Sequence, residues 1–240
     1  LFKLIETDLT LSDISINQMI ATHANQFITD IFSSFVIIQD LVFEGVDFSI
    51  SGSSPAPLIT GQNSNLYLLR AHFKDPRVGV SSIVSLKGEG SLQISDSSFL
   101  YWRGIMINQL IELIGLETIA INRCVFQGVE NLIAATDVNH FLFVENTVLT
   151  NSLGKLLNID TSSDISIFAN HFLNLQELIQ SGVDLRYYSA EEYYGSRASF
   201  EPIYLAGSQI TITDVRGFAN FYNNKFCSLK GLNGIIEVTA

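Results

Sequence analysis

The segments LYLLRAHF (66–73), LQISDSSF (92–99), IAINRCVF (119–126), FLFVENTV (141–148), ISIFANHF (165–172) and FYNNKF (221–226) are variations on one pattern. In the first five, two apolar residues stand two positions apart, and a Phe or Val follows five positions after the second. That closing residue recurs at steps of 26, 27, 22, 24 and 54 residues. A repeat of about 20–50 residues is typical of a solenoid, in which each unit buries its apolar face against its neighbours.

A second series of apolar residues recurs in phase with the first. Its members are Leu58-Ile59, Ile83-Val84, Ile111 with Leu113, Leu132-Ile133, Leu156-Leu157, Leu178-Ile179 and Ile235-Ile236. Such short runs, separated by polar residues and Gly, favour strands and turns over amphipathic helices. The Leu and Asn signature of leucine-rich repeats is missing. The sequence therefore predicts an all-β parallel β-helix solenoid of about 8–9 coils, with one coil per repeat.

Three of the repeats carry an Asn two residues before the closing position: NTV (146–148), NHF (170–172) and NKF (224–226). In these short motifs the chain resembles the right-handed parallel β-helix of the pectin-lyase-like superfamily, from about residue 14 to the C-terminus. The resemblance implies a corner at which Asn side chains of successive coils form a ladder. Because Ala71, Ser97 and Cys124 occupy the same slot elsewhere, this ladder is expected to be partial.

The aromatic series is expected to form an internal column. Phe48, Phe73, Phe99, Phe126, Phe172 and Phe226 are assigned to one slot of the repeat. Rings stacked in this way belong to the core and do not line a ligand groove.

The chain is interpreted as a single β-helix domain, residues 1–240, and as a fragment of a longer solenoid. Its register before Leu41 stays open. Residues 183–208 break the repeat as a Tyr-rich insertion, which is either a loop on one coil or a degenerate extra coil. Loops on a rigid scaffold often carry binding sites. The candidate binding residues are Tyr187, Tyr188, Tyr193, Tyr194, Arg186 and Arg197; the alternative is a loop packed against its own coil.

Charge and composition exclude several partners. The net charge of −11 argues against nucleic acid. The most apolar stretch, Gly104 to Ile121, contains Glu112 and Glu117, so no membrane span is expected in this segment. Cys124 and Cys227 are placed about four coils apart, too far for a disulfide.

The sequence contains no recognisable catalytic, cofactor or metal motif. The histidines are scattered, so neither a metal site nor a cofactor is predicted. The lyase and hydrolase motifs of the resembled superfamily are absent. Asp137, Asp160 and Asp164 lie near turns, where two carboxylates at glycosidase spacing would be conceivable, but solvated turn residues are expected.

The sequence thus favours a structural or adhesive segment of a larger extracellular, surface or assembly protein, and not an enzyme. Its partners would be other protein subunits or glycans. The extracellular or cell-surface location rests on the resemblance alone. The alternatives are a carbohydrate-active enzyme of the polysaccharide lyase or glycoside hydrolase type and a dedicated ligand-binding module.

Overall fold

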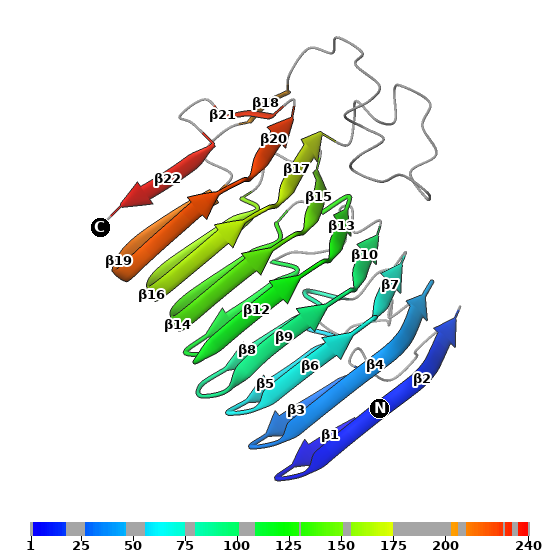
Figure 1. The fold of residues 1–240 in the computed structure, drawn as a ribbon. Helices are drawn as coiled ribbons and strands as arrows, with labels where there is room; N and C mark the ends of the chain where they lie inside the picture. The colour runs from blue at the N-terminus through cyan, green and yellow to red at the C-terminus, as the bar shows by residue number, and fades with distance from the viewer. Residues whose placement is uncertain are drawn as a thin grey trace.

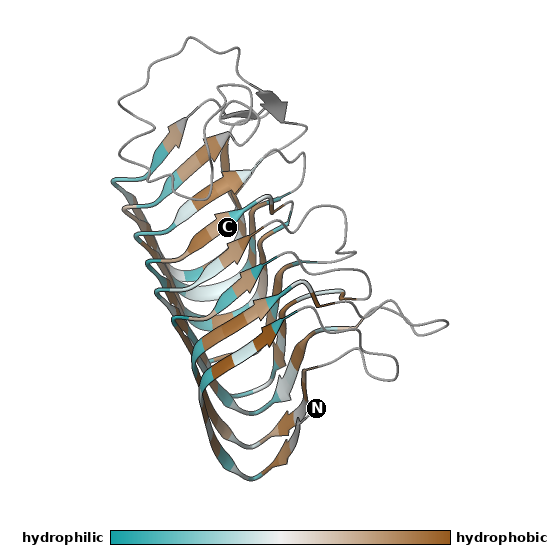
Figure 2. Cartoon of the chain, turned by 90° about the vertical axis from the view of Figure 1, so that its right-hand side faces the viewer, coloured by the Kyte–Doolittle hydropathy of each residue, from teal (hydrophilic) through white to brown (hydrophobic). Residues whose placement is uncertain are grey.

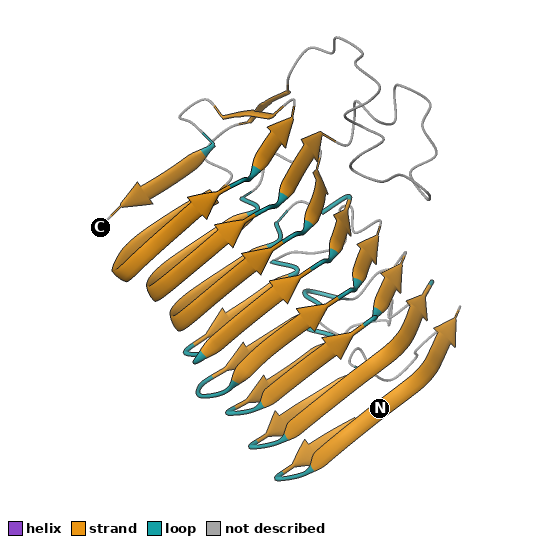
Figure 3. Cartoon of the chain, in the orientation of Figure 1, coloured by secondary structure: helices purple, strands orange, loops and turns teal. Residues whose placement is uncertain are grey.

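The computed structural model describes residues 2–17, 27–46, 56–74, 80–100, 109–129, 131–150, 155–174, 203–205, 210–227, 229–231 and 235–239. All regular secondary structure in these described residues is β-strand, and the strands stack into a rod (Figure 3). The described ladders between strands are parallel. The predicted all-β parallel solenoid is therefore confirmed. Its right-handedness stays a prediction, supported by the strong preference for right-handed connections between parallel strands.

Three sheet faces run along the rod, and each complete turn of the chain contributes a strand, or part of a longer strand, to each face (Figure 1). We call one such turn a rung. Of the last turn, the structure describes only the first-face strand, β22 (Ile236–Thr239). The first face stacks, in order, β1 (Phe2–Ile5), β3 (Ile28–Phe32), β5 (Ile59–Gln62), β8 (Val84–Lys87), β11 (Ile111–Ile114), the starts of β14 (Ile133–Val144), β16 (Leu157–Phe168) and β19 (Ile210–Tyr222), and β22 (Ile236–Thr239).

The second face stacks strands that follow the first corner of each rung. In order they are the starts of β2 (Asp8–Asn17) and β4 (Phe35–Glu44), then β6 (Asn65–Leu69), β9 (Ser91–Ser95), β12 (Thr118–Asn122) and the ends of β14, β16 and β19. The third face stacks the ends of β2 and β4, then β7 (His72–Lys74), β10 (Ser98–Leu100), β13 (Val125–Gln127), β15 (Thr147–Thr150), β17 (His171–Asn174) and β20 (Lys225–Cys227).

Alternation along each strand separates the core from the surface. On β6, for example, Leu66 and Leu68 are fully buried while Asn65, Tyr67 and Leu69 face outward. Figure 2 shows the resulting change between hydrophobic and hydrophilic residues along the strands. This two-residue period is what the short apolar runs of the sequence predicted.

The aromatic column of the third face is confirmed, with one correction. Phe73, Phe99 and Phe126 pair in register, are fully buried and have ring centroids 5.3 and 5.0 Å apart. The residue in register with Phe73 on the preceding rung is Phe43 and not Phe48, which lies outside the described residues. Phe43 stands 30 residues before Phe73, a longer step than the repeat suggested.

The Asn ladder is also confirmed. Asn146 Oδ1 accepts a 2.9 Å hydrogen bond from the backbone N–H of Cys124, and Asn170 Oδ1 accepts one of 2.9 Å from Asn146. Asn224 Oδ1 continues the series by accepting the N–H of Asn170 at 3.1 Å. Because Asn146 and Asn170 are buried, these bonds satisfy amide groups that water cannot reach.

The long step of 54 residues adds no rung to the main stack. β16 pairs directly with β19, and β17 pairs directly with β20. Ile210 therefore takes the register position after Leu157 that the sequence had assigned to Leu178-Ile179, which lies outside the described residues. Between β17 and β19 the structure describes only β18 (Ile203–Leu205), which pairs with β21 (Leu229–Gly231) in a separate two-stranded sheet.

The same pairing explains a one-residue difference between two similar segments. TDVNHF (136–141) and TDVRGF (213–218) both turn the first corner, and the register shifts by one residue between β16 and β19 at this point. Val138 and Val215 both pair with Ser162, whereas His140 and Phe218 both pair with Asp164. The extra residue of β19 is therefore taken up as a β-bulge at the corner.

Candidate functional site

The binding residues predicted from the sequence all lie outside the described residues. This applies to Arg186, Tyr187, Tyr188, Tyr193, Tyr194 and Arg197. Their role as a contact site stays a prediction. The described residues provide other candidates, namely acids at the corners and a groove on the first face.

The three candidate acids gather at the corner between the first and second faces. Asp137 adopts φ 56° at the corner itself, where its carboxylate lies 3.3 Å from Arg216. Asp160, at the end of the first face, accepts a hydrogen bond from Thr213. Asp164, at the start of the second face, lies 3.2 Å from His140 Nδ1. Each acid is thus tied to a different neighbour on another rung. Asp160 and Asp164 are partly buried residues of β16 and not the fully solvated turn residues expected from the sequence.

The corner between the second and third faces carries a charge ladder, which we define as Asp40, Arg70, Asp96 and Arg123. These residues occupy equivalent corner positions on successive rungs, each with φ between 50° and 54°. Arg70 donates two hydrogen bonds of 2.6 and 2.7 Å to Asp40, and Arg123 donates two of 2.6 and 2.8 Å to Asp96.

The paired guanidinium groups change the titration of the ladder acids. The hydrogen bonds from Arg70 hold the pKa of Asp40 below its ordinary value, and those from Arg123 do the same for Asp96. All four side chains are at least one-third exposed, so water screens the pairs and each stabilises the rod only weakly. The main consequence of the ladder is that acidic and basic side chains alternate at fixed positions along this corner. Its contribution to the free energy of unfolding is small.

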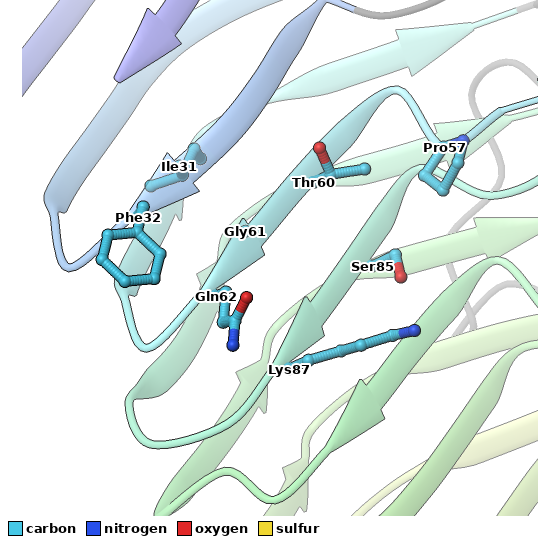
Figure 4. A pocket seen from close by; sticks show the side chains of 8 residues that line it. All are labelled: Ile31, Phe32, Pro57, Thr60, Gly61, Gln62, Ser85 and Lys87. Atoms are coloured by element: carbon cyan, nitrogen blue, oxygen red, sulfur yellow. The ribbon is translucent and has the colours of Figure 1, made fainter. Parts of the chain in front are cut away.

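A groove of about 430 Å³ crosses the outer side of the first face between β3 and β8. Phe32, Gln62 and Lys87 line it near the first corner, Thr60 and Ser85 lie further back along β5 and β8, and Pro57 lines its far end (Figure 4). Small ligands occupy pockets of about 300–1,000 Å³, so this groove could hold part of one.

The core beneath the groove depends on a glycine. Gly61 takes an inward position between Ile31 and Leu86 on the neighbouring rungs. A Cβ at this position would lie 2.8 Å from Leu86 Cδ2 and 3.2 Å from Ile31 Cβ. Gly61 therefore leaves room for the Ile31 and Leu86 side chains below the groove floor, and any larger residue would take that room away.

The surface of the groove combines groups that suit a polyhydroxy ligand. The ring of Phe32 is 39% exposed and offers an apolar face. Thr60, Ser85 and Gln62 add hydroxyl and amide groups, and the Lys87 ammonium extends along β8 past Ser85 (Figure 4). No carboxylate of the described residues forms an ion pair with Lys87. The groove is thus a candidate contact site for a saccharide or a polar peptide segment.

Metal sites, membrane-spanning helices and cysteine reactivity are further properties that bear on the function of the part of the chain that the structure describes. It contains no cluster of three or more His, Cys, Asp or Glu side chains suited to a metal ion. It also contains no helix long and apolar enough to cross a membrane. Cys124 is buried in the Asn-ladder slot, and burial raises the pKa of its thiol to about 12, so the reactive thiolate is not formed near neutral pH.

The cysteine separation predicted from the sequence needs a correction. Cys124 and Cys227 lie three rungs apart and not four, because Cys124, Asn146, Asn170 and Asn224 occupy successive rungs. At about 4.8 Å per rung this is still about 14 Å, beyond the reach of a disulfide.

Comparison with known proteins gives no relative. No family model, no curated protein and no solved structure matches the chain.

Proposed function

We propose that the chain is a structural or adhesive segment of a larger extracellular, surface or assembly protein, and that it binds other protein subunits or glycans without chemical turnover. The observation that carries this proposal is the way in which the polar side chains of the described residues are used. Asp40, Asp96, Asp137, Asp160 and Asp164 each interact with a neighbouring or nearby rung instead of converging on one point.

Such an arrangement suits a rigid scaffold. Successive rungs hold outward side chains at a fixed spacing of about 4.8 Å, so that a partner meets a preordered surface and little conformational entropy is lost on binding. The groove beside Phe32 and Lys87 and the Tyr-rich insertion are the two regions to which we assign contacts. The assignment to the pectin-lyase-like superfamily and to the cell exterior belongs to this proposal.

The test combines binding with turnover. The purified chain is applied to a glycan array and incubated with polygalacturonate and common glycans, with and without calcium. We expect binding without release of reducing sugar. Replacing Tyr187, Tyr188, Tyr193 and Tyr194 by Ser in one variant should abolish partner binding. If these tyrosines lie in a loop off the rod, as the proposal requires, the melting temperature should stay nearly unchanged, because such residues contribute little to stacking.

Two outcomes would contradict the proposal. Sugar release that is lost in Asp137→Asn, Asp160→Asn or Asp164→Asn would establish the enzymatic alternative. A large fall in melting temperature of the tyrosine variant, with unchanged binding, would show that these tyrosines pack on the rod and that the contacts lie elsewhere. Lys87→Gln serves as the matched variant for the groove, since it removes the charge and keeps a polar side chain that is only one atom shorter.

A further inference from the structure

The outer side of the second face is a broad, nearly uncharged surface on a strongly acidic chain. Among its outward-facing residues only Asp8 and Asp164 carry a carboxylate, and none is Lys or Arg. The net charge of −11 makes copies of the chain repel one another. A face with so few charges is therefore one on which two copies can approach at low electrostatic cost.

Apolar side chains gather toward both ends of this face. Near the N-terminal end, Phe35 is 37% exposed and its ring centroid lies 5.0 Å from that of Tyr67. Near the C-terminal end, Phe218 is 52% exposed and Phe168 stacks on Tyr222 at 4.6 Å. The smaller side chains of β9 and β12 lie between the two groups, as the order of strands in Figure 1 shows.

The positions of these groups match a twofold axis. We infer that two copies pack through their second faces, related by a twofold axis that runs along β12 and reverses the order of rungs. This operation keeps the position along the strand and exchanges β4 with β19 and β6 with β16, because each pair is equally far from β12 in the stack. Phe35 of each copy then faces Phe218 of the other.

The remaining positions are compatible with the same axis. Leu69, at the end of β6, faces Phe168, at the end of β16. Asn65 faces Asp164 at the starts of the same strands, so an amide can donate to a carboxylate. Ala120, in the middle of β12, meets its own copy on the axis, where a small side chain allows close approach. A self-complementary surface of this kind is what an isologous dimer requires.

The shared part of the face is large enough for a reversible dimer. The axis pairs the seven strands from β4 to β19, and β2 has no counterpart. At about 4.8 Å per strand and five residues of about 3.3 Å, the footprint is about 550 Å² per copy, or about 1,100 Å² in total, above the roughly 1,000 Å² that a specific interface needs. The dimer goes beyond the proposed function. A monomeric rod could still serve as a scaffold, so its failure would leave that function in place.

The test is the oligomeric state measured by sedimentation velocity over a range of concentrations. We expect a reversible dimer, and we expect Ala120→Arg to raise its dissociation constant by about tenfold or more, because two cations would meet on the axis. The matched control is Ala134→Arg, which places the same residue on the outer side of the first face and should dimerise like the natural chain. A natural chain that stays monomeric, or an Ala120→Arg variant that dimerises normally, would overturn the inference.

Nitroxide labels then test the axis. Cys227 is replaced by Ser, and the buried Cys124 stays unlabelled. Because the rungs of the two copies run in opposite directions, a label one rung from the axis lies two rungs from its copy, and a label four rungs away lies eight rungs from its copy. With about 4.8 Å per rung and about 10 Å between the packed faces, a single label at position 93, on β9, should lie about 14 Å from its copy. A single label at position 10, on β2, should lie about 40 Å from its copy. Equal distances at the two positions would contradict the antiparallel arrangement.

Discussion

Phe143 fills the space that Val148 leaves in the aromatic column. Val148 takes the inward position between Phe126 and Phe172 on the third face. Phe143 projects inward from the second face of the same rung, and its ring lies 6.1 Å from Phe126 and 6.4 Å from Phe172. The column therefore continues through this rung, although the residue that supplies the ring comes from another face.

Exchanging the two residues tests this compensation. Phe143→Val should cost about 2–3 kcal/mol by opening a cavity, and Val148→Phe about 1–3 kcal/mol by overpacking. The double variant should be more stable than the sum of the two changes predicts, by about 1–2 kcal/mol. Urea unfolding of the four proteins measures the coupling. Strictly additive effects would show that the two side chains do not share one space.

Asn170 should be the most sensitive member of the Asn ladder. It is fully buried; its Oδ1 accepts from Asn146, and its Nδ2 donates to Phe143 O at 2.8 Å. Asn170→Ala leaves these backbone groups unsatisfied and should lower the free energy of unfolding by about 2–3 kcal/mol. Asn158→Ala, on the outer side of the first face, is the control and should have little effect. Equal losses in both variants would argue against the ladder.

Cys124 offers the opposite test, because it stands where an Asn would extend the ladder. Its Sγ lies 3.7 Å from Ile94 O, the position that an Asn Nδ2 takes on later rungs, as Asn146 does toward Ile121 O at 3.0 Å. Cys124→Asn should raise the free energy of unfolding by about 0.5–1.5 kcal/mol. Chemical denaturation measures the change. A destabilised variant would mean that the slot is too small for Asn on this rung.

The charge ladder predicts a pH dependence. Because the pKa of Asp96 is lowered in the folded chain, its pairing with Arg123 stabilises the fold above the ordinary value of about 3.8 and is lost as pH falls through the lower folded value. The stability difference between the natural chain and Arg123→Gln should therefore be small, constant near neutral pH and vanishing in acid. Lys155→Gln is the charge-matched control. A difference that persists in acid would exclude this ion pair as its cause.

Much of the fold could be predicted because short sequence motifs within each repeat determine the register between rungs. The spacing from an inward pair to the closing Phe places Phe73, Phe99 and Phe126 in one column without any long-range information. The prediction was wrong at Phe48 because the step before Phe73 is 30 residues, longer than the four steps of 22–27 residues that follow it. Leu178-Ile179 fitted the apolar pattern, but direct pairing of β16 with β19 gives the position to Ile210.

The surface was less predictable than the core. The alternation of Asp40, Arg70, Asp96 and Arg123 could have been found by reading the residue three before each closing position of the repeat. The groove had no such signal, because Phe32, Gln62 and Lys87 come from three rungs whose spacing differs. The small number of charges on the outer side of the second face likewise becomes visible only when the outward positions of successive strands are aligned.

The scaffold account depends most directly on a stack that continues past the insertion. Ser98 and Lys225 occupy equivalent outward positions on the third face, four rungs apart through Val125, Thr147 and His171. Nitroxide labels are placed at positions 98 and 225 of a Cys227→Ser chain, which is diluted with unlabelled protein. Double electron–electron resonance then measures the distance between the two labels. The account predicts about 19 Å with a narrow distribution. A distance of about 24 Å would reveal an additional coil between β17 and β20, and a broad distribution would contradict the continuous stack.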